Sequence, residues 1–288
     1  MTGSSASVRL RFAPSPNGRL HLGHAYSALV NEVFAARLGG NLILRIEDID
    51  PVRSRPNLIA AIEDDLAWLG IGFGGSVRRQ SEHLPAYRGA IDALHSRGLV
   101  YPCFCSRAAV IAAASREPPR DPDGAPVYPG TCRVLSHDER ASRLATGLPH
   151  GWRLDMAHAL TQAPGPHRFR CLDADCVQTS HVADPARWGD ALIARRDVPT
   201  SYHLSVVIDD AAQKISHVVR GADLTASTDL HVLLQALLGF HSPAYHHHGL
   251  ILGPDGTKLA KSRGSESLGD LRAQGVTPAE IRCRLGFE

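Results

Sequence analysis

Apolar and polar positions at the start of the chain change from a strand period to a helix period. Apolar residues alternate with charged ones from Val8 to Phe12, which predicts a strand. From Leu22 to Leu38 apolar residues recur every three or four positions, which predicts a helix. The stretch from Arg11 to His24 is therefore a strand-to-helix turn, and its prolines, asparagine and glycine give it a stiff bend.

The alternation of strand and helix continues along the next segments. Asn41 to Ile46 is predicted as a strand, and Leu58 to Leu69 and Leu84 to Arg97 are predicted as helices that each end before a glycine. Strands and helices in alternating order favour an α/β fold, in which helices cover a parallel sheet and ligands bind at the carboxyl ends of the strands.

The pattern is less regular further along. Trp152 to Cys176 is predicted to hold only short strands and turns, and Glu117 to Pro126 is too rich in proline and aspartate for regular structure. Val206 to Ile208 fits a buried strand or a buried helix. The other expected elements are helices at Arg107 to Ala114, Ser136 to Thr146, Thr225 to Leu238, Leu268 to Ala273 and Pro278 to Leu285, and strands at Ile215 to Val219 and Leu250 to Leu252.

Composition narrows the class of protein. The chain has 288 residues, of which 43% are apolar, and no apolar run is long enough to cross a membrane. Its first seven residues are small and polar and resemble no signal segment, so we expect a cytoplasmic protein without a membrane partner. Since 31 basic residues stand against 29 acidic ones, the net charge is only +2, and any contact with RNA should be local.

The strand-to-helix turn has the chemistry of a phosphate site. A helix that begins there directs its unpaired N–H groups and partial positive charge at whatever lies above the sheet edge. His21 and His24 add donors for phosphate oxygens, and Gly23 leaves bare backbone against which an adenine ring can lie.

Three of the six cysteines suggest a metal site. Cys103, Cys105 and Cys132 lie close together in the sequence, and in a reducing cytosol this spacing favours a metal over disulfides. Three thiolates need one further ligand to complete a tetrahedral zinc site. Cys171 and Cys176 show no metal-ligand spacing and are expected to be ordinary core residues.

Three blocks of sequence resemble the catalytic core of the class I glutamyl-tRNA synthetases. They are the Arg11 to His24 stretch, Leu44 to Asp50 and Lys258 to Ser262, in the family's order, with Ala260 where the family usually has serine. The resemblance implies a Rossmann-type parallel sheet with a small zinc-containing insertion and a C-terminal helical piece. It also implies four segments: the first half of the catalytic domain (1–100), the insertion (101–187), the second half (188–245) and the lysine loop with C-terminal helices (246–288).

The resemblance also assigns the residues of the site. Those implied to be catalytic are His21, His24, Lys258 and Lys261, and those implied to bind ATP are His21, Gly23, His24 and Lys261. The implied glutamate-binding residues are Arg11, Ser15, Glu47, Tyr202 and Arg220. Because these residues are spread from position 11 to position 261, the prediction requires the fold to bring both ends of the chain together.

The family includes short paralogues without the anticodon-binding region, and the chain resembles them most. They transfer glutamate to the queuine-derived base in the anticodon of tRNA(Asp), and they hold a zinc ion with a Cys-x-Cys, a tyrosine and a cysteine four residues beyond it. The matching positions are Cys103, Cys105, Tyr128 and Cys132, which implies one structural zinc ion per chain. The implied partners are ATP with Mg²⁺, L-glutamate and tRNA(Asp) carrying queuosine, and we expect a monomer.

Three alternatives stay open from the sequence. A truncated glutamyl-tRNA synthetase would charge tRNA(Glu), a non-catalytic relative would bind RNA without turnover, and another nucleotidyltransferase of the His-x-Gly-His type would ligate a small molecule. His246, His247 and His248 fit none of the implied roles and are predicted to be structural or to face RNA, since adjacent histidines on a strand point to opposite faces.

Overall fold

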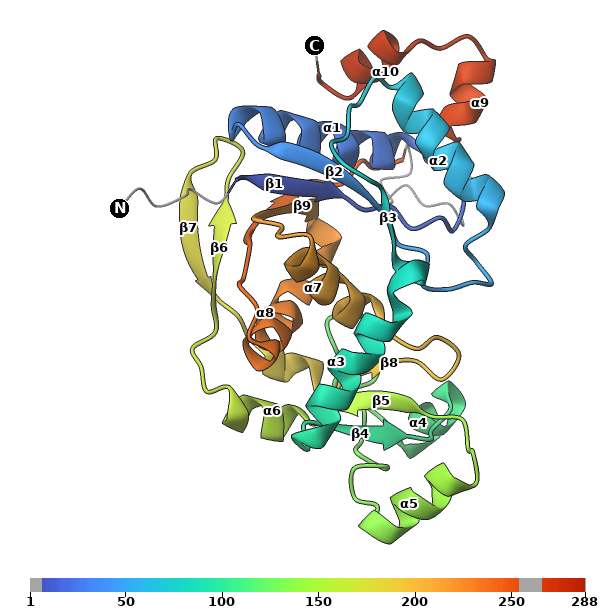
Figure 1. Cartoon of the computed structure of the whole chain (residues 1–288), viewed down its shortest axis with the longest axis vertical. Coiled ribbons are helices and arrows are strands. Elements are labelled where there is room, and N and C mark those ends of the chain that lie inside the picture. Colours follow the sequence, from blue (N-terminus) through green and yellow to red (C-terminus); the bar gives the residue numbers. More distant parts are fainter. Residues whose placement is uncertain (1–6, 254–265, 288) are drawn as a thin grey trace.

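One mixed sheet of seven strands forms the centre of the molecule, shown in Figure 1 as a computed structural model that describes residues 7–253 and 266–287. The strand order is β3-β2-β1-β9-β10-β6-β7, and only β7 runs antiparallel to its neighbour. The strands are β1 (Arg9–Phe12), β2 (Asn41–Ile46), β3 (Arg78–Arg79), β6 (Arg168–Leu172), β7 (Gln178–Val182), β9 (His217–Gly221) and β10 (Ala244–His248).

Helices cover both faces of this sheet. On one face lie α1 (Leu22–Arg37) and α2 (Pro56–Trp68), and on the other lie α7 (Tyr202–Ala212) and α8 (Ser227–Leu238) (Figure 1). Leu29 of α1 is fully buried in the core of the first face. This arrangement confirms the parallel α/β fold that the strand and helix periods predict.

A smaller antiparallel sheet lies on the far side of α7 and α8 from the main one (Figure 1). It consists of β4 (Val100–Cys103), β5 (Gly151–Leu154) and β8 (Leu192–Ala194). The helices α3 (Leu84–Ser96) and α6 (Met156–Gln162) pack against it in a second core that also contains α7 and α8. Two outer helices, α4 (Arg107–Ala113) and α5 (His137–Ala145), bury no residue (Figure 1). The 3-10 turns are η1 (Gln80–His83), η2 (Pro185–Trp188) and η3 (Ala222–Leu224).

The structure decides three points about the middle of the chain. The stretch expected to hold only strands and turns contains the helix α6. The run Val206 to Ile208, which fitted a strand or a helix, belongs to the helix α7. Strands β6 and β7 fall inside the 101–187 segment, yet their hydrogen bonds join the main sheet.

The prediction of a strand at Leu250 to Leu252 is wrong. The strand in this part of the chain is β10, which contains the three histidines and ends before Gly249. The apolar run was too short to specify a strand, whereas the polar-looking segment before it gains hydrogen bonds from β9 along its whole length, from Ala244 to His248. The strand therefore forms where β9 offers a partner, and the local sequence of β10 contains no information about that partner.

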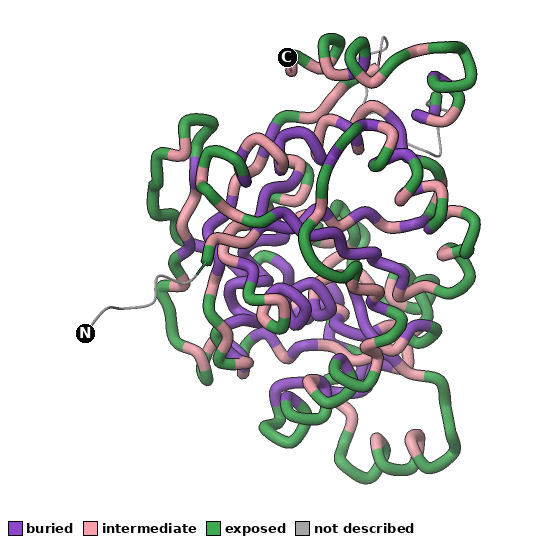
Figure 2. Tube along the Cα trace, turned by 45° about the horizontal axis from the view of Figure 1, so that its top comes forward, coloured by how far each residue is buried: buried purple, intermediate pink, exposed green. Residues whose placement is uncertain are grey.

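The C-terminal helices α9 (Leu268–Ala273) and α10 (Pro278–Arg284) form where the sequence predicts them. Leu268 and Ile281 are fully buried in the same core as α1 and α2. Figure 2 shows how the buried positions gather in the centre of the molecule. Within the described ranges, every helix is too short or too polar to cross a bilayer.

Candidate functional site

A cavity of about 910 Å³ opens at the carboxyl ends of β1, β2, β9 and β10. It lies where β1 and β9 adjoin, the point at which the chain's crossovers change from one face of the sheet to the other. Most of the residues implied to form the site line it: Arg11, Ser15, His21, Gly23, His24, Glu47, Tyr202 and Arg220. Lys258 and Lys261 lie outside the described residues.

The first helix begins at the edge of the cavity with a pair of histidines. His21 caps α1, and its Nδ1 accepts from the backbone N–H of Gly23 at 3.1 Å. The Nδ1 of His24 accepts from the backbone N–H of His21 at 3.2 Å, and the two ring centroids are 3.9 Å apart. With Nδ1 accepting in both rings, the neutral imidazoles carry their proton on Nε2, which is the tautomer that donates to an anion.

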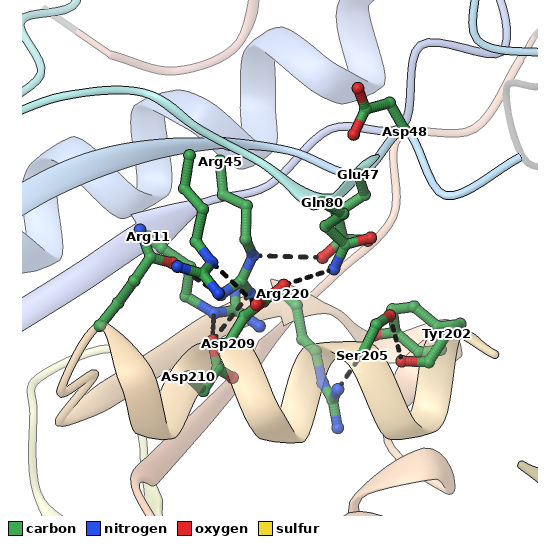
Figure 3. Close-up of polar contacts among 12 residues, drawn as sticks. Arg11, Arg45, Glu47, Asp48, Gln80, Tyr202, Ser205, Asp209, Asp210 and Arg220 are labelled. Atoms are coloured by element: carbon green, nitrogen blue, oxygen red, sulfur yellow. Dashed lines mark hydrogen bonds and ion pairs between the residues drawn. The ribbon is translucent and has the colours of Figure 1, made fainter. Parts of the chain in front are cut away.

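One acid on the opposite helix holds two buried arginines. Asp210 of α7 accepts from Arg11 Nε at 3.0 Å and from Arg45 Nη2 at 2.7 Å, as Figure 3 shows. Although burial opposes ionisation of Asp210, the two guanidinium groups hold the pKa of its carboxyl below the ordinary value. The side chain of Arg11 is therefore fixed at the cavity wall by a charge-assisted contact.

Glu47 faces the cavity at the end of β2. Its carboxyl lies 3.6 Å from Arg45 Nε, and the residue is only 9% exposed. Burial raises the pKa of this carboxyl to about 7, against the lowering influence of Arg45 and Arg11. A buried carboxylate of this kind is suited to receive a cation such as an ammonium group.

Arg220 approaches from β9 and meets Tyr202 at the start of α7. The guanidinium Nη1 donates to the Tyr202 hydroxyl at 3.2 Å (Figure 3). Arg220 is 5% exposed, and burial raises the pKa of the Tyr202 phenol. The cavity thus combines two buried guanidinium groups, a buried carboxyl and a helix N-terminus, which together suit a ligand with carboxylate, ammonium and phosphate groups.

The sequence did not predict the role of Asp209 and Asp210, the two acids of α7 that support the wall of the cavity. Asp209, fully buried beside Asp210, accepts from Arg78, Gln80 and the Tyr87 hydroxyl at 2.8 to 3.0 Å. Asp209 therefore ties η1 and α3 to α7. Two adjacent acids directly after an apolar helical run were the available signal, because acids in a buried helix are almost always paired.

The three cysteines and Tyr128 meet in the small sheet's loop region. The three sulfur atoms lie within 4.8 Å of one another, and the sulfurs of Cys105 and Cys132 are 3.5 Å apart. The Tyr128 oxygen is 3.5 Å from Cys103 and 3.4 Å from Cys105. A tetrahedral zinc with bonds near 2.3 Å would separate its sulfur ligands by about 3.8 Å, so the four atoms fit one metal ion.

The surroundings of this cluster affect the pKa values of its thiols in opposite directions. The guanidinium of Arg153 donates to Cys103 Sγ at 3.3 Å and lies over the Tyr128 ring at 3.8 Å from its centroid. Burial opposes ionisation of Cys132, yet hydrogen bonds from Tyr128 and from the Phe104 N–H lower the pKa of this thiol. Burial raises the pKa of Cys105 to about 11, as expected for a thiol that only a bound cation would deprotonate.

Comparison with known proteins agrees with this geometry. Residues 7–287 match the model of the family described as tRNA synthetases class I (E and Q), catalytic domain. The chain is 46% identical to the glutamyl-Q tRNA(Asp) synthetase of Rhodobacter capsulatus, over 96% of this chain and 99% of that protein. It is 41% identical to the protein of the same name from Symbiobacterium thermophilum, over 96% of this chain and 85% of that protein.

Solved structures show the same fold. The crystal structure of a glutamate-tRNA synthetase from Elizabethkingia anophelis superposes with a TM-score of 0.70 at 30% identity. The match covers 90% of this chain and 53% of that one, so the chain spans about half the length of that synthetase. Together the cavity, the fold and these matches place the chain in the family of class I tRNA synthetases for glutamate and glutamine (E and Q), whose catalytic domain it forms.

Proposed function

We propose that this protein activates L-glutamate with ATP and transfers it to queuosine in the anticodon of tRNA(Asp). The observation that carries the proposal is the single cavity in which Arg11, Glu47 and Arg220 meet the histidine-capped start of α1. One part of this cavity suits an acidic amino acid and the other suits a nucleotide phosphate, and adenylate formation requires the two side by side.

The amino-acid side of the cavity accounts for glutamate. Arg11 and Arg220 would pair with its carboxylates, and Glu47 with Tyr202 would receive its ammonium group, while Ser15 orients it. Glutamine would leave a buried guanidinium without its anionic partner, so the site would reject it.

The nucleotide side would bind the phosphates of ATP, taken up as its Mg²⁺ complex. His21 and His24 would donate hydrogen bonds to phosphate oxygens, and the adenine ring would lie against the bare backbone of Gly23. A glutamate carboxylate oxygen then attacks the α-phosphorus, and the bond to the bridging oxygen breaks to release pyrophosphate. Lys258 and Lys261, which we propose close the site from the other side, would stabilise the charge that develops.

We further propose that the cluster of Cys103, Cys105, Tyr128 and Cys132 holds one structural zinc ion. The distances among the four ligand atoms and the guanidinium of Arg153 beside them support this assignment. The cluster lies in a segment whose helices α4 and α5 bury no residue, so a metal would replace the missing core.

Our choice of tRNA(Asp) as the acceptor of glutamate is based on the names of the relatives. The two relatives with the highest identities reported above are named for tRNA(Asp), and the chain covers 99% and 85% of their lengths. The glutamate–tRNA ligase from Koribacter versatilis is 37% identical, and the chain covers only 56% of it. Charging of tRNA(Glu) is therefore our second candidate function.

Two assays test the proposal in sequence. Glutamate-dependent exchange of labelled pyrophosphate into ATP without tRNA should occur, and its absence would contradict activation. Labelled glutamate is then offered with queuosine-containing tRNA(Asp), unmodified tRNA(Asp) and tRNA(Glu). We expect label on the first alone, and label on tRNA(Glu) alone would transfer the assignment to an ordinary glutamyl-tRNA synthetase.

A further inference from the structure

Two buried arginines of the cavity differ in how their charge is balanced. Arg11 has a carboxylate partner in Asp210 at 3.0 Å. Arg220, equally buried, forms no ion pair with any carboxylate of residues 7–253 or 266–287. A buried charge without a counter-ion is costly, so a protein that keeps one has arranged other groups around it.

The groups around Arg220 are neutral hydrogen-bond acceptors. Its Nη2 donates to Thr228 Oγ1 at 2.7 Å, its Nη1 donates to His231 Nδ1 as well as to Tyr202, each at 3.2 Å, and its Nε faces His247 Nε2 at 3.4 Å. Four of the five N–H groups of the guanidinium thereby donate hydrogen bonds, and none of these four donates to an anion.

Three elements of the fold build this arrangement. His247 lies directly opposite Arg220 in the register of β9 and β10. Thr228 and His231 are one turn apart on α8 and are almost fully buried. Because strand pairing and helix packing fix these positions, the guanidinium is held in one place before any ligand arrives.

The histidines stay uncharged in this environment. Burial, together with the charge of Arg220, lowers the pKa of His247 to about 3 and the pKa of His203 to about 4, and it lowers the pKa of His231 in the same direction. His231 accepts on Nδ1, so its proton is on Nε2, which donates to His203 Nδ1 at 3.2 Å. The Thr228 hydroxyl donates to His247 Nε2 at 3.0 Å.

We propose that Thr228, His231 and His247 are positioning residues that hold Arg220 as an unneutralised cation, so that the site demands a carboxylate on its amino acid and rejects the carboxamide. The inference rests on the proposed function and deepens it, because it assigns the choice of glutamate over glutamine to neutral side chains behind the binding arginine. It also assigns a role to His247, the middle residue of the three-histidine run.

The sharpest test compares an acid and its amide at one position. Thr228→Asp would place a carboxylate against Nη2 of Arg220, whereas Thr228→Asn has nearly the same shape without the charge. In pyrophosphate exchange, we expect Thr228→Asp to raise the KM for glutamate at least about 100-fold with little change in kcat, and to reduce the preference for glutamate over glutamine. Thr228→Asn should keep that preference.

Controls separate this effect from a loss of fold. His246→Asn alters the neighbouring histidine, whose ring instead contacts Phe34 and the Leu172 carbonyl, and it should leave the KM for glutamate unchanged. If Thr228→Asp does not fold, judged by thermal unfolding, the pair Thr228→Val and Thr228→Ser decides. The valine variant should lose affinity for glutamate, and the serine variant should recover it.

The outcomes distinguish this inference from the proposed function. Equal KM values and equal glutamate preference in Thr228→Asp and Thr228→Asn would overturn the role of the neutral acceptors. Absence of exchange by the unaltered protein would instead contradict activation. In that case calorimetric titration of the same variants with glutamate and with glutamine still tests the inference, because it measures binding alone.

Discussion

Opposing influences act on the carboxyl of Glu47. Burial favours its neutral form, whereas the two guanidinium groups nearby favour the charged form, and burial has the larger effect. The result is a carboxyl that titrates near neutral pH instead of near 4.5. Between these two values the native state binds one proton more than the unfolded chain, so the contribution of Glu47 to the free energy of unfolding falls as the pH rises.

Glutamate binding should therefore depend on pH around 7. Because the role we propose for Glu47 is to receive the ammonium group of glutamate in its ionised form, we expect the KM for glutamate to be about tenfold higher at pH 6 than at pH 8. The KM is measured by pyrophosphate exchange with ATP saturating. In Glu47→Gln the KM should be high throughout and this inflection should vanish; an inflection that persists in the variant would belong to another group.

At this scale the sequence predicted the residues that line the cavity better than the residues that lie behind them. Arg11, His21 and Arg220 belong to motifs or lie on strands that end at the cavity. Thr228 and Asp210 belong to no motif. Their contacts depend on how α7 and α8 pack on the sheet, which a one-dimensional pattern does not contain.

Among the elements, periodicity predicted the helices better than the strands. The predicted bounds of α1, α3 and α9 agree with the structure to within one residue. By contrast, β10 was missed because its Tyr-His-His-His sequence carries no alternation of apolar and polar side chains. A strand in the middle of a sheet is stabilised by its neighbours, so its own sequence can be uninformative.

The loops that carry the cysteine cluster should depend for their stability on the proposed zinc ion. We expect one zinc per chain by elemental analysis and its loss in Cys132→Ser, with a lower Tm, because three of four ligands hold the ion much more weakly. Tyr128→Phe should retain zinc with reduced affinity. Cys283→Ser, which changes an exposed cysteine outside the cluster, is the matched control and should keep its zinc. Equal zinc contents in Cys132→Ser and Cys283→Ser would refute the site.

The whole molecule brings distant segments together at the cavity. One core contains α1, α2 and the C-terminal helices, and a second contains the small sheet with α7 and α8. The cavity is lined by α1 from the first core and by α7 from the second. No local sequence window contains both walls, so the motifs could predict which residues meet but not which packing holds them there.

The C-terminal helices should therefore contribute to stability although they are far from β1 in sequence. Leu268 is fully buried in the first core, and its N–H donates to the Leu20 carbonyl at 2.8 Å, next to His21. Leu268→Ala should lower the free energy of unfolding by about 2–5 kcal/mol in urea titrations, because it leaves a cavity among α1, α2 and α9. Val182→Ala removes apolar atoms from a side chain that is 58% exposed on β7 and should cost less than about 0.5 kcal/mol. Similar losses in the two variants would show that the C-terminal helices are not part of the cooperative core that supports the start of α1.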